Sequence, residues 1–299
     1  MTLPNFLIIG AAKAGTTSLY NYLEQHPDVF MSPDKEPRFF AFKGDTSGNY
    51  PYTELHQYEK LFNGVTTEKM AGEASTFYLY SKSAPDCIKE HVPDVKLVAV
   101  LRNPIDRAYS QFVYWQREGK EVETDFAKIV NEELDNMQAE NSDSYIMRGM
   151  YGSQLQRYFD IFPKEQIRVY LFEDLCERPE EMLKDVFGFL NIDDTFKVNF
   201  SKNYNVSTMP QSGIKQVIYA FIMRQNRLKA TLMKILPNNI YWKYIAPLAR
   251  TLANALRSRK KLAVRPLDNV IRQQLIDVYR DDIQLTEKLI NRDLQSWLR

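Results

Sequence analysis

Residues 6–18 read FLIIGAAKAGTTS, and this stretch decides the class of fold. The apolar run at 5–10 stops at a glycine and predicts a buried strand, whereas residues 16–25 have the apolar spacing of a helix. A strand, a glycine-containing loop and a helix form the opening unit of a nucleotide-binding α/β fold. Because the loop residues are small, successive backbone N–H groups can close around an anion at the start of the helix.

The rest of the chain repeats this alternation of strand and helix. Further buried strands are predicted at 95–101 and 168–172, and helices at 104–118, 179–190 and 267–289, with an acidic helical stretch at 120–145 that contains a loop at 140–143. We therefore predict one domain, 1–299, with a P-loop-like three-layer α/β fold. Its central, mainly parallel sheet would be flanked by helices.

Composition excludes several classes of protein. The chain has 299 residues and a net charge of +1, so it is not a nucleic-acid binder by composition. Its two cysteines, Cys87 and Cys176, lie outside any CxxC pattern, and its three histidines are scattered. A disulfide framework, a zinc ribbon and a His-built metal site are excluded on this basis, and no metal is expected. Without a signal peptide or an apolar run of about 18 residues, a cytoplasmic location is expected.

Positive charge is concentrated in one segment. Residues 214–266 contain twelve Lys and Arg and no Asp or Glu, so the remainder of the chain carries about 1 − 12 = −11. Apolar residues recur there at helical spacing, which predicts a basic helical insert, 214–265. Two interpretations stay open. The insert is either a helical subdomain with a solvated basic face, or a surface for an anionic acceptor or for the anionic lipids of an inner membrane face.

The loop departs from the Walker pattern of kinases and ATPases. Gly10 and Gly15 have the Walker spacing, but Thr16 stands where that pattern requires lysine. The loop lysine is Lys13 instead, and no magnesium-binding acid clearly follows a strand. These departures weaken a kinase or NTPase interpretation.

Several motifs, taken in order along the chain, resemble one family. The run at 6–19 resembles the 5′-phosphosulfate loop of sulfotransferases that use 3′-phosphoadenosine 5′-phosphosulfate (PAPS). The run KEPRFF at 35–40 is similar to the Glu-x-x-Phe-Phe segment of the heparan sulfate N- and O-sulfotransferase branch, and VAVLRNPxxRAYS at 98–110 to the family's 3′-phosphate motif. GEASTFY at 72–78 and the C-terminal segments at 279–282 and 297–298 also occur in family order. The resemblance covers about 4–200 and 266–299.

The resemblance implies roles for individual residues. Lys13 would stabilise the leaving phosphate, and Glu36 would act as general base toward the acceptor. The 5′-phosphate would be held by the amides of residues 14–17 and by three hydroxyls, and the 3′-phosphate by Arg102 and Ser110. The full set is Lys13, Ala14, Gly15, Thr16, Thr17, Ser18, Glu36, Arg102 and Ser110. Arg107 is interpreted as an ordinary surface arginine and His26 as a packing residue at a helix end.

The sequence also departs from the family pattern. Ala74 stands where several relatives carry lysine, and the late loop that closes on the 3′-phosphate is missing, although the basic run at 257–261 could replace it by charge. Arg38 stands where relatives have histidine or glutamine, so it could contact the acceptor. That acceptor could be a glycan, a glycolipid or a small metabolite. A kinase, or a polyanion- or membrane-binding module with a vestigial nucleotide site, stays as the alternative.

Overall fold

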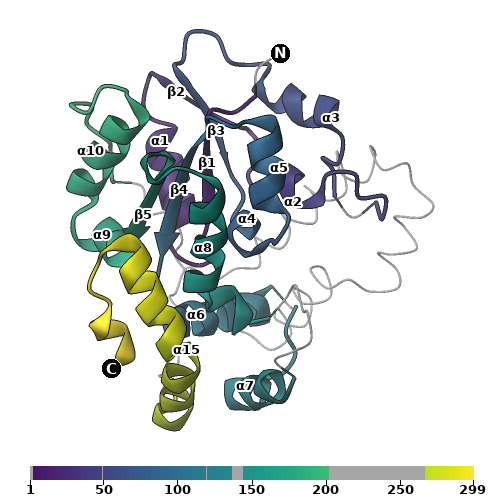
Figure 1. Ribbon diagram of the computed structural model, residues 1–299, viewed down its shortest axis with the longest axis vertical. Helices are drawn as coiled ribbons and strands as arrows, with labels where there is room; N and C mark the ends of the chain where they lie inside the picture. The colour runs from purple at the N-terminus through teal and green to yellow at the C-terminus, as the bar shows by residue number, and fades with distance from the viewer. Residues whose placement is uncertain (1–2, 49, 119, 137–143, 202–266) are drawn as a thin grey trace. The chain divides into compact units, whose positions relative to one another are not determined.

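The computed structural model describes residues 3–48, 50–118, 120–136, 144–201 and 267–299. Its centre is a parallel sheet of five strands in the order β2-β3-β1-β4-β5 (Figure 1). The strands are β1 (Phe6–Gly10), β2 (Val29–Met31), β3 (Met70–Ala74), β4 (Lys96–Leu101) and β5 (Ile167–Leu171). All neighbouring pairs run parallel, so the carboxyl ends of the strands meet at one edge of the sheet.

Helices flank the sheet (Figure 1). The α-helices in the described part of the chain are α1 (Thr16–Leu23), α2 (Phe39–Phe42), α3 (Leu55–Glu59), α4 (Phe77–Tyr80), α5 (Ala84–His91), α6 (Pro104–Arg117), α7 (Phe126–Asp135), α8 (Tyr151–Ile161), α9 (Phe172–Glu177), α10 (Pro179–Leu190) and α15 (Asn269–Ile290). This arrangement confirms the predicted α/β class with a parallel sheet between helices. The strands and helices expected around 5–25, 95–118, 168–190 and 267–289 occur within a few residues of the predicted bounds.

The core is built around β1, the middle strand. Its five residues are all buried, and Phe6 pairs with Gly72 of β3 on one side and with Lys96 of β4 on the other. A Cβ at Gly72 would lie 2.3 Å from the ring of Phe6. Glycine at this position therefore lets β3 pair beside β1, which carries the phosphate loop at its end.

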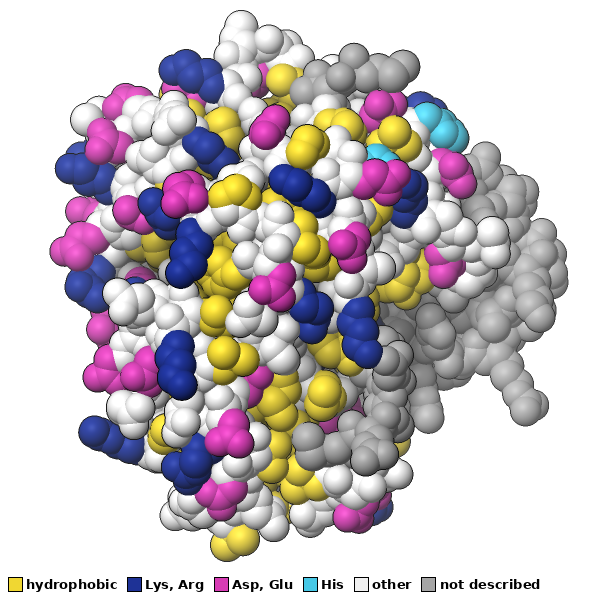
Figure 2. Space-filling model, viewed as in Figure 1, with side chains coloured by type: hydrophobic (Ala, Val, Ile, Leu, Met, Phe, Trp, Pro, Cys, Tyr) yellow, Lys and Arg dark blue, Asp and Glu magenta, His cyan; other side chains and the backbone are white. Residues whose placement is uncertain are grey.

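Two compact units make up the chain. The first comprises Met1–Ala108, Ile146–Tyr204 and Arg272–Arg299, and contains the sheet; the second comprises Tyr109–Tyr145 and Asn205–Ile271. The predicted basic insert and the run at 257–261 lie outside the described residues. On the face seen in Figure 2, acidic and basic side chains of the described residues are interspersed. No helix in the described part of the chain is both long enough and apolar enough to cross a membrane.

Candidate active site

The loop between β1 and α1 has an unusual backbone. Lys13 and Gly15 both have a left-handed conformation, with φ of 69° and 89°. The amide of Ala11 donates to the carbonyl of Val100 in β4 (2.7 Å), and the amide of Ala14 donates back to Ala11 (3.2 Å). Gly15 is the N-cap of α1, whose first N–H groups have no acceptor within the helix. The loop thus presents amides and the positive end of a helix dipole, which suits an anion.

Gly15 is required by space as well as by conformation. A Cβ there would lie 2.6 Å from Cδ2 of Leu175 and 3.2 Å from the ring of Phe172, both in α9. The left-handed backbone also disfavours any residue with a side chain. Because α9 closes on Gly15, the loop is held between the sheet and this short helix.

Arg102 joins the loop at the next strand. It directly follows β4, which lies beside β1 in the sheet. Its Nη1 donates to the carbonyl oxygen of Lys13 (3.3 Å), and its guanidinium lies 4.7 Å from the centre of the Phe172 ring. The structure therefore brings Lys13 and Arg102 together, as expected for residues at the carboxyl ends of adjacent parallel strands.

Glu36 lies in the segment that follows β2, and this segment runs beside the carboxyl end of β3. Its amide donates to the carbonyl of Ala74 (2.9 Å), and its carboxylate accepts from the N–H and the hydroxyl of Thr76 (2.9 Å each). Lys35 Nζ lies 3.1 Å and Arg38 Nε 3.5 Å from its oxygens. Burial disfavours the charge, but these two cations and the hydrogen bonds from Lys35 and Thr76 outweigh burial, so the pKa of Glu36 lies below its usual value. Glu36 is therefore ionised at neutral pH.

Residues other than glycine that adopt a left-handed backbone conformation are concentrated at this site. Five described residues other than glycine have positive φ, and three of them are Lys13, Glu36 and Arg38. The other two are asparagines, which tolerate this conformation far better. Each such position costs on the order of 1–3 kcal/mol, and proteins retain that cost mostly at functional sites. The backbone thus marks the same residues that the sequence motifs select.

A small hollow lies beside the loop and Thr76. It is lined by Ala11, Ala12, Thr76, Phe77, Leu79, Tyr80, Arg148 and Gln154. Thr76, which holds Glu36, therefore shares this hollow with the loop residues Ala11 and Ala12. The guanidinium of Arg148 lies over the rings of Phe77 (5.4 Å) and Tyr80 (5.7 Å). The lining of the hollow thus includes two aromatic side chains, a cation and the end of the loop.

The remaining candidates have different outcomes. Ser110 lies on α6 in the second compact unit, so a shared site with Arg102 stays a prediction. Arg107 is wholly buried, so its interpretation as a surface residue is wrong: a helical position does not reveal which face is covered. His26 is buried and bonds to the Asp193 carbonyl (2.9 Å) and the Asp28 amide (3.0 Å), which agrees with its predicted packing role.

Three residues that shape the candidate site were not identified from the sequence. Thr76 stands within a family-like run, but its bonds to Glu36 depend on two segments 40 residues apart. Phe172 and Leu175 resemble any apolar helix residues, and only the folded chain places them against Gly15 and Arg102. Apolar spacing alone would have identified them as buried and nothing more.

Comparison with known proteins places the chain in a family. Residues 3–224 match the sulfotransferase domain family. The crystal structure of a sulfotransferase from Alicyclobacillus acidocaldarius superposes with a TM-score of 0.73 and 28% identity over 100% of both chains. Carbohydrate sulfotransferase 15 of Rattus norvegicus is 27% identical over 248 residues, with 64% of this chain and 44% of that protein covered.

Two further relatives are more distant or much longer. The human bifunctional heparan sulfate N-deacetylase/N-sulfotransferase 3 is 25% identical over 312 residues, with 99% of this chain and 31% of that protein covered. The membrane-associated sulfotransferase kil1 of Dictyostelium discoideum is 22% identical, with 64% and 57% covered. The chain thus spans from about a third to just over half of these curated relatives. On the family match and the superposition together, the chain belongs to the sulfotransferase domain family.

Proposed function

We propose that the protein transfers a sulfuryl group from PAPS, the donor that this family uses, to a hydroxyl or amine of an acceptor. The observation that carries the proposal is the contact between Arg102 and the backbone of Lys13 (3.3 Å). It brings the guanidinium of Arg102 to the backbone of the loop that contains Lys13 and leads into α1, at the carboxyl ends of β1 and β4. A nucleotide with phosphate groups at both its 5′ and 3′ positions needs such a paired arrangement.

The residues present fit this donor. The loop is built from small residues, and Gly15 lets α9 pack against it in the left-handed conformation that leads into α1. Amides at the start of α1, with the hydroxyls of Thr16, Thr17 and Ser18, would hold the 5′-phosphate. The forked guanidinium of Arg102, stacked on Phe172, would hold the 3′-phosphate, with Ser110 as a second donor.

Each chemical role falls to a residue of this chain. Transfer forms a bond from the acceptor oxygen or nitrogen to sulfur and breaks the bond from sulfur to the bridging oxygen, which keeps the electron pair. Lys13 would neutralise the charge that grows on that leaving phosphate. Glu36, ionised and held by Thr76, would accept the proton of the acceptor. The residues proposed to act catalytically are therefore Lys13 and Glu36, with no metal ion in the step.

The acceptor would enter the hollow beside Thr76. Two of the relatives are named for carbohydrate and heparan sulfate substrates. Arg148, held over Phe77 and Tyr80, offers a cation that the anionic groups of a sulfated or carboxylated glycan could contact. A glycan is accordingly the acceptor class that we favour, with glycolipids and small metabolites as alternatives.

Calorimetry tests the donor assignment. We expect 3′-phosphoadenosine 5′-phosphate to bind tightly and ATP with magnesium to bind poorly. Arg102→Ala should weaken bisphosphate binding by about 2–4 kcal/mol, roughly 30- to 1000-fold, because charge-assisted bonds are lost.

Arg168→Ala is the matched control. Arg168 also lies over a phenylalanine ring, that of Phe189 (5.0 Å), but it stands at the amino end of β5, away from the strand ends that carry the loop, so this variant should bind normally. Equal affinity of the wild type for ATP and for the bisphosphate would overturn the assignment.

A further inference from the structure

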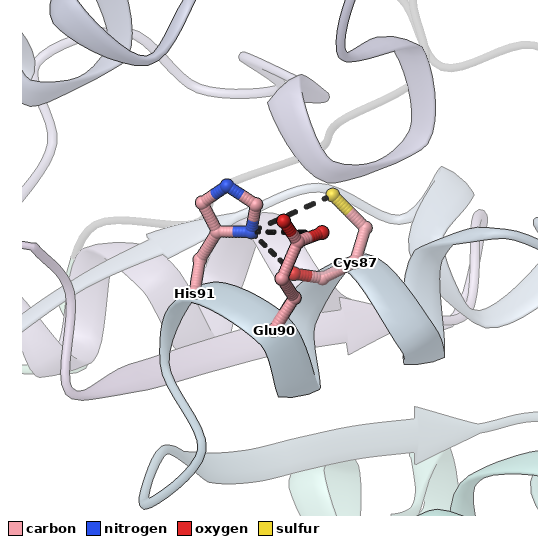
Figure 3. A group of neighbouring side chains, drawn as sticks. All are labelled: Cys87, Glu90 and His91. Atoms are coloured by element: carbon pink, nitrogen blue, oxygen red, sulfur yellow. Dashed lines mark hydrogen bonds and ion pairs between the residues drawn. The ribbon is translucent and has the colours of Figure 1, made fainter.

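The last turns of α5 bring together three side chains that ligate metals. Cys87, Glu90 and His91 stand at positions i, i+3 and i+4, so they share one face of the helix. Figure 3 shows the thiol and the carboxylate turned toward the Nδ1 edge of the imidazole. Cys87 Sγ lies 4.0 Å and Glu90 Oε2 3.7 Å from His91 Nδ1, and all three ligand atoms lie within 4.8 Å of one another.

The two separations from His91 Nδ1 are close to those of a tetrahedral zinc site. Zinc bonds of about 2.3 Å to sulfur and about 2.0–2.2 Å to nitrogen or oxygen put neighbouring ligand atoms roughly 3.3–3.6 Å apart. The distances from Nδ1 exceed that spacing by a few tenths of an ångström, which small side-chain rotations can remove. A thiolate, an imidazole and a carboxylate select zinc, cobalt or similar ions over magnesium and calcium.

The surroundings of the three residues favour an ion that enters from solvent. The side chain of Glu90 is 65% exposed, whereas that of His91 is only 10% exposed and contacts the rings of Phe39 and Phe40 (5.9 and 6.1 Å between centroids). The imidazole is thus fixed by packing, and the carboxylate is accessible. Solvent can supply the fourth ligand, as in zinc sites with three protein ligands.

Two existing contacts would compete with the ion. His91 Nδ1 lies 2.8 Å from the Cys87 carbonyl oxygen, which can only accept, so Nδ1 carries a proton that metal binding must release. The ammonium of Lys43 lies 3.2 and 3.4 Å from the two oxygens of Glu90. A positive charge therefore already occupies one edge of the cluster, and removing it should strengthen metal binding.

We propose that Cys87, Glu90 and His91 bind one zinc ion or a chemically similar divalent transition metal. The site lies on α5 and uses none of the residues of the proposed sulfuryl transfer. It also differs from the expectation that no metal binds, which came from the scattered histidines. A mixed cysteine, glutamate and histidine set on one helix needs only a single histidine.

Cobalt(II) titration of the reduced, full-length protein tests this site. We expect one equivalent of cobalt to give the near-ultraviolet charge-transfer band of a cobalt–thiolate bond, and zinc to displace it. Cys87→Ser should abolish the band, whereas Cys176→Ser, at an exposed cysteine on α9, should leave it intact. Glu90→Gln should weaken zinc binding by about tenfold or more. This exposed position makes a folded variant easy to obtain, and thermal unfolding checks it.

Lys43→Gln should change zinc affinity in the opposite direction. Because it removes a competing cation without touching a ligand, zinc should bind this variant more tightly than the wild type. A band that survives Cys87→Ser, or a zinc affinity that Glu90→Gln leaves unchanged, would overturn the proposal.

Discussion

Glu36 is the residue whose charge state the proposed chemistry depends on. Lys35, Arg38 and Thr76 keep its pKa below the usual 4.5, although burial alone would raise it. A general base acts only while it is ionised, so its titration sets the acid limb of the pH–rate profile. Glu73 is the neighbouring carboxyl with the opposite perturbation, because burial raises its pKa to about 7.

We predict that Glu36→Gln lowers turnover by about 10²–10⁴ while bisphosphate affinity is kept. In the wild type, kcat/KM should fall only below about pH 4.5, since Glu36 is ionised above that value. Initial rates between pH 4 and 8 measure both effects. An acid limb near pH 7, or a Glu36→Gln variant that keeps most of its activity, would assign the base to another group.

Glu73 is expected to act on stability. Its side chain is wholly buried, and Tyr58 donates a hydrogen bond to it (3.1 Å). Its folded pKa of about 7 lies above the usual 4.5, so the folded state holds the proton between these pH values while the unfolded chain releases it. Its contribution is therefore fully present below about pH 4.5 and is lost as pH rises toward 7.

Glu73→Gln should consequently stabilise the protein at pH 8 relative to wild type, by up to about 3 kcal/mol, and change stability least below about pH 4.5. Urea unfolding at a series of pH values measures this difference. The control is Glu165→Gln, at an exposed residue, which should show no such trend. A Glu73→Gln variant whose stability tracks wild type at every pH would contradict the prediction.

Among the elements, α9 connects the C-terminal segment to the phosphate loop. Its Phe172 and Leu175 contact Arg102 and the space around Gly15. Its Asp174 accepts from the Leu171 amide (2.9 Å) and from both terminal nitrogens of Arg292 (3.0 Å each). Burial would raise the pKa of Asp174, but Arg292 and the Leu171 amide outweigh it and lower that pKa. The pair therefore stabilises above the usual carboxyl pKa and is lost in acid, the opposite sign to Glu73.

Arg292→Gln should therefore loosen α9 and, with it, the loop. We expect the free energy of unfolding to fall by about 1–3 kcal/mol, because the largely buried carboxylate of Asp174 loses two hydrogen bonds from one guanidinium. Bisphosphate binding should weaken as well. Arg178→Gln is the control, since Arg178 is more exposed and makes one longer bond to Asp174 (3.4 Å). Urea unfolding and calorimetry on both variants give the comparison. If Arg292→Gln lowers stability but leaves bisphosphate affinity unchanged, α9 does not support the loop.

The strands and helices that could be predicted are those with a recognisable pattern of apolar residues in their own sequence. The strands that end at Gly10 and Leu101 are long buried runs, and the placement of Lys13 beside Arg102 follows from the meeting of parallel strand ends. β2 and β3 were not predicted as strands, since β2 has three residues and β3 contains Gly72 and Glu73, both poor strand formers. Glycine there serves packing against Phe6, a reason that only the fold supplies.

Contacts between distant segments were beyond local patterns. The pair Asp174–Arg292 spans 118 residues, and Thr76 reaches Glu36 across 40. Arg107 shows the same limit in another form, because its position on a helix gave no sign that it is wholly buried. The sequence selects residues by type and spacing, and the fold decides which of them meet.

At the scale of the whole molecule, the uneven distribution of charge along the chain has no role in the proposed transfer reaction. Residues 214–266 hold twelve basic and no acidic residues, while the rest of the chain carries about 1 − 12 = −11. On the face seen in Figure 2, by contrast, the described acidic and basic side chains are interspersed. Isolated surface charges add little to stability, so this segregation along the chain favours a role in binding an anionic partner.

We therefore predict that acceptor KM rises with ionic strength, because salt screens this attraction beyond about 10 Å at 0.1 M. Reversing Arg224, Arg227 and Lys229 to glutamate should raise acceptor KM, or abolish binding to vesicles of anionic lipid, while bisphosphate affinity is kept. Reversing the exposed Lys164, Lys184 and Lys197 changes net charge equally at other places, so a weaker effect there separates local attraction from total charge. If the first triple reversal changes neither acceptor kinetics nor vesicle binding, these three residues do not contact an anionic partner, and their charges serve only to interact with solvent.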